Sequence, residues 1–107
     1  MPWLKMLKGE TPGRAFSLDR DITVLGRDAA CEIVLTDSQV SKRHARIIRK
    51  DDGFHVEDLA SVNGTKVGDR DLTGVQRLED GDLIAIGSTV LTYYAEGETT
   101  IQESPAS

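Results

Sequence analysis

A serine and a histidine bracket two cations in the tetrapeptide SKRH. Ser41 and His44 are the residue types of a nucleophile and its general base, while Lys42 and Arg43 carry charge that binds anions. The tetrapeptide is therefore compatible with a catalytic pair, a helix cap or an anion site. Catalysis would also need an oxyanion hole and a third group such as Asp58, and no G-x-S-x-G elbow is present. We expect His44 instead to form structural hydrogen bonds beneath a loop, so that the Ser41 hydroxyl and nearby backbone N–H groups face outward.

A further cation follows directly on a strand-like run. In LGRD (25–28), the alternating pattern of DITV ends at a glycine and then Arg27. By itself the segment is typical of a bulge or turn glycine followed by a solvated arginine. The functional interpretation makes Arg27 a fixed guanidinium fork at the end of a strand, which suits bidentate binding of a phosphate or carboxylate.

An Asn-Gly pair lies in the stretch SVNGT (61–65). A turn is the commonest meaning of that dipeptide. Asn63 nevertheless offers a carbonyl oxygen and an amide group on one side chain, which is the pairing needed to clamp the backbone of an extended peptide. The stretch alone is compatible with both interpretations.

The charge balance disfavours nucleic acid as a partner. The chain of 107 residues has a formal net charge of −5, and residues 1–95 hold 15 acids and 13 bases. Binding to nucleic acid by counterion release needs a strongly basic surface, which so balanced a body does not provide. The five bases between residues 42 and 50 also lack interleaved aromatic side chains. Only a local anion site is therefore expected.

The cysteine and histidine content excludes other classes of site. Cys31 is the only cysteine, so an intrachain disulfide and a cysteine-based metal cluster are impossible. Two histidines far from it do not form a metal site, and we expect no cofactor. The chain has neither an apolar leader nor a run approaching the ~18 apolar residues of a membrane span. We therefore expect a cytoplasmic location and no membrane partner.

Short strand-like runs alternate with glycine-containing turns along the chain. The runs have period-two or continuous apolar character, and no long window keeps a helical period of about 3.6 residues. They are WLKML, AFSL, ITVLG, EIVL, HARII, FHVEDL, DLIAIG and TVLTYYA. Turn signals at such short intervals predict an all-β sandwich or barrel. We interpret DDG (51–53) and EDGD (79–82) as tight hairpin turns whose glycine takes a positive φ.

The inward positions of these runs predict the hydrophobic core. They include Leu4, Met6, Phe16, Leu18, Ile22, Val24, Ile33, Leu35, Ala45, Ile47, Val56, Leu83, Ile86, Leu91 and Tyr93. Residues 96–107 are acidic and polar, with Ile101 as their one large apolar residue, and are typical of a linker or tail. We therefore expect one domain over residues 1–95 and a flexible acidic tail over residues 96–107. Further domains C-terminal to the tail are compatible with this layout.

The order of the motifs is more specific than any one of them. Gly26-Arg27, then Ser41-x-x-His44 after IVLTDSQV, then EDLASVNGT and LEDGDLIAIG, resembles the forkhead-associated (FHA) domain family over roughly residues 3–95. LKGETPGRAFSL is similar to the first hairpin of that family. The resemblance implies a β-sandwich of about eleven short strands in two twisted, mostly antiparallel sheets, with recognition loops at one end.

The resemblance also implies a function. Such domains bind phosphothreonine in an extended peptide, as interaction modules of Ser/Thr kinase signalling, and have no enzymatic activity. Carried over by position, Arg27 and Ser41 would hold the phosphate oxygens. Lys42 and Arg43 would assist them, and Asn63 would hydrogen-bond the peptide main chain. The positions that would shape the loops are Gly26, His44, Gly64 and Thr65.

One position departs from the family pattern. Many members have a threonine or serine directly before the asparagine, whereas this chain has Val62. Only the backbone N–H of Val62 can then contact phosphate, and the missing hydrogen bond predicts an affinity cost of ~1.5 to 3 kcal/mol unless Lys42 or Arg43 compensates. The alternative is an FHA fold that binds an unphosphorylated protein partner through its loops or its sandwich face.

Two further hypotheses concern segments outside these motifs. The loop KVGDRDL (66–72) is expected to help select the third residue after the phosphothreonine, with Arg70 favouring an acidic side chain. Thr99 and Thr100 lie in an acidic stretch that a Ser/Thr kinase could phosphorylate, although an unmodified linker is the simpler interpretation.

Overall fold

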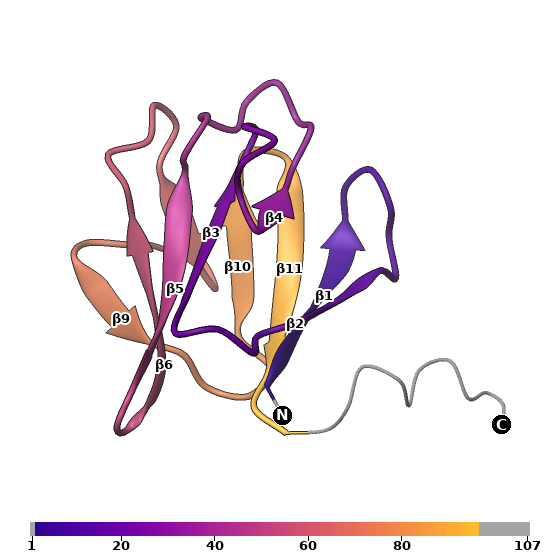
Figure 1. Ribbon diagram of the computed structural model, residues 1–107. Coiled ribbons are helices and arrows are strands. Elements are labelled where there is room, and N and C mark those ends of the chain that lie inside the picture. The colour runs from indigo at the N-terminus through magenta and orange to yellow at the C-terminus, as the bar shows by residue number, and fades with distance from the viewer. Residues whose placement is uncertain (1, 97–107) are drawn as a thin grey trace, which may run out of the picture.

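Eleven strands and no helix make up the part of the chain that the structure describes, residues 2–96 of this computed structural model (Figure 1). The strands are β1 (Trp3–Lys8), β2 (Ala15–Ser17), β3 (Ile22–Gly26), β4 (Ile33–Val34), β5 (Ala45–Lys50), β6 (Gly53–Asp58), β7 (Thr65–Val67), β8 (Arg70–Asp71), β9 (Val75–Arg77), β10 (Leu83–Ile86) and β11 (Thr89–Tyr94). The predicted all-β fold class with about eleven short strands is confirmed.

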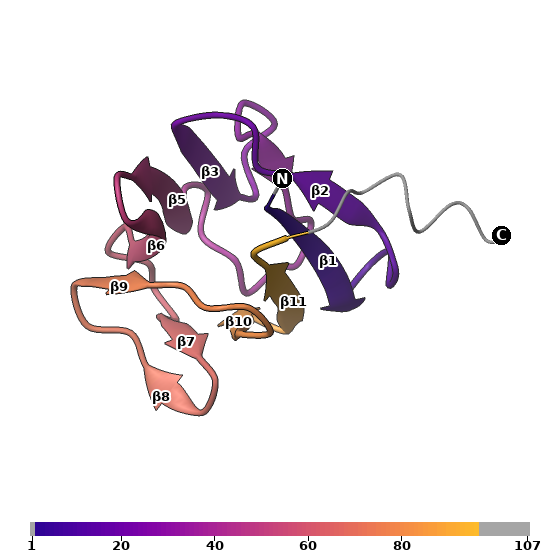
Figure 2. The ribbon, with the colours of Figure 1, turned by 90° about the horizontal axis from the view of Figure 1, so that it is seen from below.

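The strands form two sheets that face each other as a sandwich (Figure 2). The six-stranded sheet has the order β2-β1-β11-β10-β7-β8, and the five-stranded sheet has the order β4-β3-β5-β6-β9. Neighbouring strands are antiparallel except β3 and β4, which run parallel. The pairing of β1 with β2, with Leu4 opposite Phe16, confirms the predicted first hairpin.

The core lies between the sheets, and two of its predicted members are wrong. Most predicted positions are buried, and Phe16 is partly buried against them. Ile22 and Leu83, however, are 45% and 39% exposed. Their neighbours in the opposite phase of the pleat, Leu25 in β3 and Ile84 in β10, point inward and are fully buried. Both faces of β10 are apolar, so alternation alone could not select the inner one. In β3, Val24 shares the phase of Ile22 and is buried, and the exposed position is the first residue of the strand.

Other buried positions also escaped the pattern. They are Trp3, Leu25, Cys31, Val40, Phe54, Val67, Leu78 and Ile84. Strands β7, β8 and β9 were not among the predicted runs, because each of them carries at most one apolar side chain.

The predicted turns have mixed outcomes. DDG joins β5 to β6 as a hairpin with Gly53 at φ 130°, as predicted. EDGD does contain a glycine with positive φ, Gly81 at 90°, but it is not a hairpin turn, because β9 and β10 belong to different sheets. The segment 66–72 is not an open loop either, since Lys66 pairs with Asp71 to form the β7–β8 hairpin.

Four segments meet at one end of the sandwich, uppermost in Figure 1. They are the end of β3, the β4–β5 connection, the β6–β7 connection and the β10–β11 turn. Antiparallel pairing places them together, because β3, β6 and β10 end where β5, β7 and β11 begin. The start of β1 and the end of β11 lie at the opposite end (Figure 1).

Two sequence hypotheses lie beyond the described part of the chain. The proposed tail, apart from Glu96, and with it Thr99 and Thr100, is outside residues 2–96. The limits of the domain therefore stay a prediction. Within the described residues, the structure contains no helix that is long and apolar enough to cross a membrane.

Candidate functional site

Gly26 brings the end of β3 against the loop of residues 41–44. The N–H groups of Arg27 and Asp28 donate to carbonyl oxygens of that loop at 3.0 and 3.1 Å. A Cβ on Gly26 would lie 2.1 Å from the carbonyl oxygen of Lys42. Only glycine permits so close an approach, so this residue determines where the Arg27 side chain begins.

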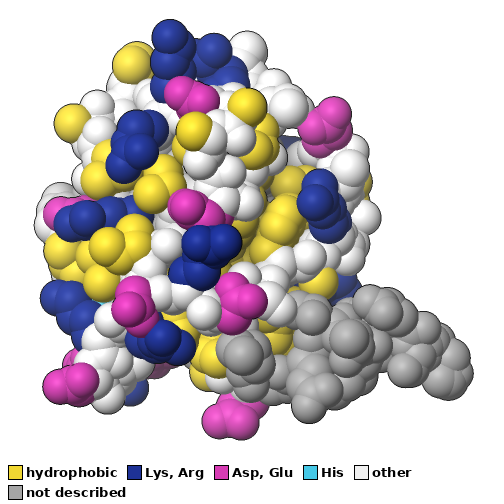
Figure 3. Space-filling view, viewed as in Figure 1, with side chains coloured by type: hydrophobic (Ala, Val, Ile, Leu, Met, Phe, Trp, Pro, Cys, Tyr) yellow, Lys and Arg dark blue, Asp and Glu magenta, His cyan; other side chains and the backbone are white. Residues whose placement is uncertain are grey.

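Arg27 is exposed and is anchored through one nitrogen. Its Nε–H donates to the carbonyl of Val40 at 2.8 Å, which leaves the two terminal guanidinium nitrogens for a ligand. Across residues 2–96, no carboxylate forms an ion pair with Arg27, Lys42 or Arg43. Lys and Arg side chains lie at this end of the molecule, as they also do elsewhere on the same face (Figure 3). The loop end therefore carries local positive charge on a chain whose formal net charge is −5.

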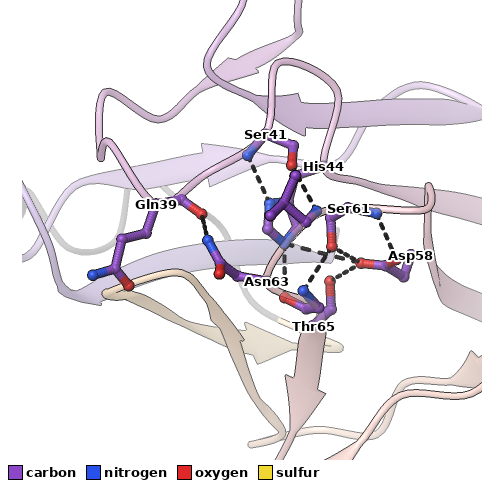
Figure 4. A network of polar contacts seen from close by, with 9 residues as sticks. Gln39, Ser41, His44, Asp58, Ser61, Asn63 and Thr65 are labelled. Carbon is purple, nitrogen blue, oxygen red and sulfur yellow. Dashed lines mark hydrogen bonds and ion pairs between the residues drawn. The ribbon is translucent and has the colours of Figure 1, made fainter.

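His44 is fully buried and joins two of the loops (Figure 4). Its Nδ1 accepts a hydrogen bond from the backbone N–H of Ser41 at 3.0 Å. The proton must then lie on Nε2, which donates to the carbonyl of Gly64 at 2.8 Å. Both ring nitrogens are therefore used in holding the two loops together.

The geometry does not assemble a catalytic triad. The Ser41 hydroxyl oxygen accepts the N–H of Val62 at 3.0 Å, and neither ring nitrogen of His44 hydrogen-bonds that hydroxyl. Asp58 Oδ1 lies 3.9 Å from His44 Nε2, which is beyond hydrogen-bonding distance. No nitrogen of His44 is positioned to take the hydroxyl proton, so this arrangement offers no activated nucleophile.

Asp58 organises the loop that carries Asn63 (Figure 4). Its carboxylate accepts hydrogen bonds from the N–H of Ser61 at 2.9 Å, the hydroxyl of Ser61 at 2.5 Å and the hydroxyl of Thr65 at 2.7 Å. The Ser61 oxygen in turn accepts the N–H of Gly64 at 2.9 Å. Burial alone would raise the pKa of Asp58, but these hydrogen bonds outweigh it and hold the pKa below its ordinary value. This network was not predicted, although Asp and Ser side chains commonly hydrogen-bond nearby backbone groups in turns.

Asn63 is exposed, and one contact orients its side chain. Its Nδ2 donates to the backbone carbonyl of Gln39 at 2.7 Å. The side-chain oxygen and the second amide hydrogen have no partner within residues 2–96. The amide is therefore held in one orientation with an acceptor and a donor left for a ligand.

The backbone N–H of Val62 has a partner within the protein. A contact of this N–H with phosphate was expected, and in the structure the N–H donates to the Ser41 hydroxyl oxygen. The Val62 side chain is 87% exposed. Because the Ser41 oxygen acts as an acceptor in this bond, its hydroxyl hydrogen is left to donate to a ligand.

A cleft of about 140 Å³ brings the candidate residues of three segments together. Its lining consists of Arg27, Ser38, Gln39, Val40, Ser41, Val62 and Asn63. Lys42 and Arg43 are exposed but do not line it, while Gly26, His44, Gly64 and Thr65 belong to the surrounding loop framework. The sequence did not predict that Ser38, Gln39 and Val40 would line the cleft.

A second hollow of about 270 Å³ shares Gln39 and Asn63 with this cleft. Lys66 also lines the second hollow, whereas Arg70 lines neither. The hydrogen-bonded pair Asn63 and Gln39 therefore lines two adjacent depressions.

Comparison with known proteins identifies relatives over most of the chain. The family model that matches residues 5–97 is described as the inner membrane component of T3SS, cytoplasmic domain. The oxoglutarate dehydrogenase inhibitor of Corynebacterium diphtheriae is 39% identical over 90 residues, which are 84% of this chain and 62% of that protein. The chain spans about three fifths of the length of the curated relatives that it matches.

Solved structures share the same sandwich. The FHA domain of the CT664 protein from Chlamydia trachomatis has a TM-score of 0.82 at 31% identity, covering 90% of this chain and 98% of that one. A structure from a study of phosphothreonine-dependent FHA domain interactions has a TM-score of 0.81 at 28% identity, covering 91% and 98%. Because the chlamydial FHA domain is 31% identical to this chain and almost wholly covered by the match, the chain belongs to the FHA domain family.

Proposed function

We propose that the protein binds phosphothreonine in an extended segment of a partner protein, with the phosphate in the cleft beside Arg27. The observation that carries the proposal is the cleft itself, where a guanidinium free of ion pairs lies with the Ser41 hydroxyl and the Asn63 amide. A phosphothreonine brings about −1.5 to −2 charges and three acceptor oxygens, which these donors complement. The similar structure that concerns phosphothreonine-dependent interactions supports the same ligand.

Each residue has a distinct part in this proposal. The terminal nitrogens of Arg27 bind two phosphate oxygens as a fork, and the Ser41 hydroxyl donates to another. Asn63 uses its free oxygen and amide hydrogen on the peptide main chain. The peptide then passes Asn63 and Gln39, which line both hollows. The residues after the phosphothreonine lie over the second hollow beside Lys66.

Lys42 and Arg43 act from beside the cleft rather than inside it. Both are exposed, and long flexible side chains can reach a bound phosphate from there. The N–H of Val62 contributes indirectly, by orienting the Ser41 oxygen.

The setting of this binding is part of the proposal. The protein would act as a non-catalytic module of Ser/Thr kinase signalling in the cytoplasm. The absence of catalysis agrees with the two ring nitrogens of His44, which are both occupied by hydrogen bonds. A phosphorylated protein as partner, and not nucleic acid, agrees with the balanced charge of residues 1–95. The curated relative named as an enzyme inhibitor acts on another protein, which supports a regulatory role.

A titration tests the phosphate site. A degenerate phosphothreonine peptide library and its unphosphorylated counterpart are titrated by calorimetry against wild type, Arg27→Ala and Arg27→Lys. Wild type should bind only the phosphorylated library, and Arg27→Ala should weaken binding about 100-fold, because it removes two charge-assisted hydrogen bonds. Arg27→Lys keeps the charge without the fork and should lie between them.

Arg49→Ala is the matched control for that titration. Arg49 pairs with Asp21 at 2.6 Å and does not line either hollow, so its loss should leave peptide affinity unchanged. The phosphate site is refuted if Arg27→Ala binds as wild type does. Equal binding of both libraries would instead favour the alternative, an FHA fold that recognises an unphosphorylated partner.

A further inference from the structure

Gln39 presents the acceptor on which the orientation of Asn63 depends. The Nδ2–H of Asn63 donates to the Gln39 carbonyl oxygen at 2.7 Å, and both residues line both depressions of the site. Asn63 itself is exposed, so packing does little to hold its side chain. The position of the Gln39 backbone therefore determines where the amide group of Asn63 points.

The carboxylate of Asp37 holds the Gln39 backbone in place. Its Oδ1 accepts the N–H of Gln39 at 2.9 Å, and the carbonyl of Asp37 accepts the N–H of Val40 at 3.0 Å. Its Oδ2 accepts the N–H of Ser88 at 2.6 Å, and the Thr89 hydroxyl lies 3.5 Å away. One side chain thus connects the β4–β5 connection to the β10–β11 turn, which is about fifty residues distant in the chain.

The β10–β11 turn is shaped to receive this carboxylate. Gly87 has φ 61°, and a Cβ there would lie 3.1 Å from Asp37 Oδ2 and 3.2 Å from the carbonyl carbon of Gln39. The turn and the connection are therefore in direct contact, and a side chain at position 87 would separate them. The hydrogen bonds also hold the pKa of Asp37 below its ordinary value, the Gln39 N–H contributing most, so the acceptor is ionised near neutral pH.

We infer that Asp37 is a positioning residue for the peptide clamp, acting through Gln39 to hold the Asn63 amide between the two depressions. The inference rests on the proposed function for its effect on binding, but the coupling of Asp37 to Asn63 exists without a ligand. Asp37 does not line the phosphate cleft or the second hollow, so its effect on a peptide is indirect.

Nuclear magnetic resonance of the free protein tests the coupling. The side-chain amide signals of Asn63 are assigned by their loss in Asn63→Ala, and are then followed in Asp37→Ala. In wild type one amide hydrogen is bonded to Gln39, so its signal should be displaced and its exchange with water slowed. Asp37→Ala should move both signals toward those of a free asparagine amide.

Asp82→Ala is the control variant for this measurement. Asp82 also accepts a backbone N–H within a turn, that of Glu79 at 2.8 Å, but it lies between β9 and β10 and lines neither depression. It should leave the Asn63 signals unchanged. Should Asp37→Ala fail to fold, Asp37→Asn gives the converse test. Its oxygen can still accept the Gln39 N–H while its amide faces the Ser88 N–H, so the Asn63 signals should stay near those of wild type, and their displacement would overturn the role assigned through Gln39.

A double-mutant cycle then connects the coupling to binding. With a phosphothreonine peptide selected from the library on wild type, Asp37→Ala should weaken binding about 3- to 10-fold, the range of one hydrogen bond. In the Asn63→Ala background the same change should cost less than about 2-fold, whereas in the Arg27→Lys background it should keep its full effect.

The two measurements separate two kinds of failure. Unchanged Asn63 signals in Asp37→Ala, or an undiminished effect of that change in Asn63→Ala, would overturn the positioning role. If wild type binds no phosphothreonine peptide, the proposed function fails, while the amide signals still decide whether Asp37 positions Asn63.

Discussion

The backbone N–H of Val62 is already hydrogen-bonded in the protein without a ligand. This N–H is bonded to the Ser41 oxygen at 3.0 Å, and the Val62 side chain is 87% exposed at the edge of the cleft. The Val62 N–H therefore orients Ser41 and does not donate to a ligand, and position 62 has no side-chain hydroxyl that could donate in its place. A side-chain hydroxyl there would add a donor without breaking the existing bond.

Replacing Val62 by threonine should strengthen binding of a phosphothreonine peptide. One added hydrogen bond to a charged oxygen predicts a gain of about 10-fold in affinity, measured by calorimetry. Val75→Thr, at a valine that is 44% exposed on β9, controls for the change of residue type. Equal affinities of Val62→Thr and wild type would show that position 62 does not face the phosphate.

Among the elements, two connections at the loop end are held together by polar groups, in addition to the apolar packing of Leu35 and Val40 in the first of them. His44 joins the β4–β5 connection to the β6–β7 connection, and Asp58 closes the latter on itself through Ser61 and Thr65. Backbone groups that would otherwise face the interior unpaired thereby find partners. The loops that carry Ser41 and Asn63 are held in shape before a ligand binds.

The low pKa of Asp58 makes this loop framework sensitive to acid. The folded protein binds fewer protons than the unfolded chain near the ordinary aspartate pKa, so the stability contributed by Asp58 is present above pH 3.8. It is lost as the pH falls through the lower folded-state value. The difference in unfolding free energy between wild type and Asp58→Asn should therefore narrow as pH is lowered from 7 to about 2.

Urea unfolding monitored by tryptophan fluorescence at several pH values measures that difference. Asp69→Asn, at an exposed carboxylate in the β7–β8 turn, controls for the removal of a charge. A difference between wild type and Asp58→Asn that stays constant down to the lowest pH would contradict the role assigned to the carboxylate.

In the whole molecule, the register of the paired strands determines both which side chains form the core and which connections meet at the binding end. Cross-strand pairing decides which face of each strand is buried, and it brings four connections to one end. In β10 the pairing puts Ile84 inside and leaves Leu83 39% exposed, although both residues are apolar. The opposite end holds the start of β1 and the end of β11 (Figure 1).

The stability of two neighbouring variants tests this register. Ile84→Ala removes a fully buried side chain and should lower the unfolding free energy by about 2 to 5 kcal/mol. Leu83→Ala should cost about 1 kcal/mol or less, because much of that side chain is already in water. Denaturant unfolding of both variants gives the comparison, and equal costs would mean that the inner face of β10 has been misassigned.

Local features of the sequence determined much of this protein. Alternating runs located eight of the strands, glycines located the turns, and the order of Gly26-Arg27, SKRH and SVNGT pointed to the family. These features could be recognised because side-chain alternation and positive φ depend on residues close in the chain.

Only the tertiary structure decided which positions of β3 and β10 are buried, that the short strands β7 to β9 form, and that Lys42 and Arg43 lie outside the cleft. It also decided that the Val62 N–H belongs to Ser41 and that Asp37 reaches Ser88. The physical reason is the same in each case. Register and hydrogen-bond partners are set by contacts between segments distant in sequence, and a pattern that is apolar or polar on both sides cannot choose among them.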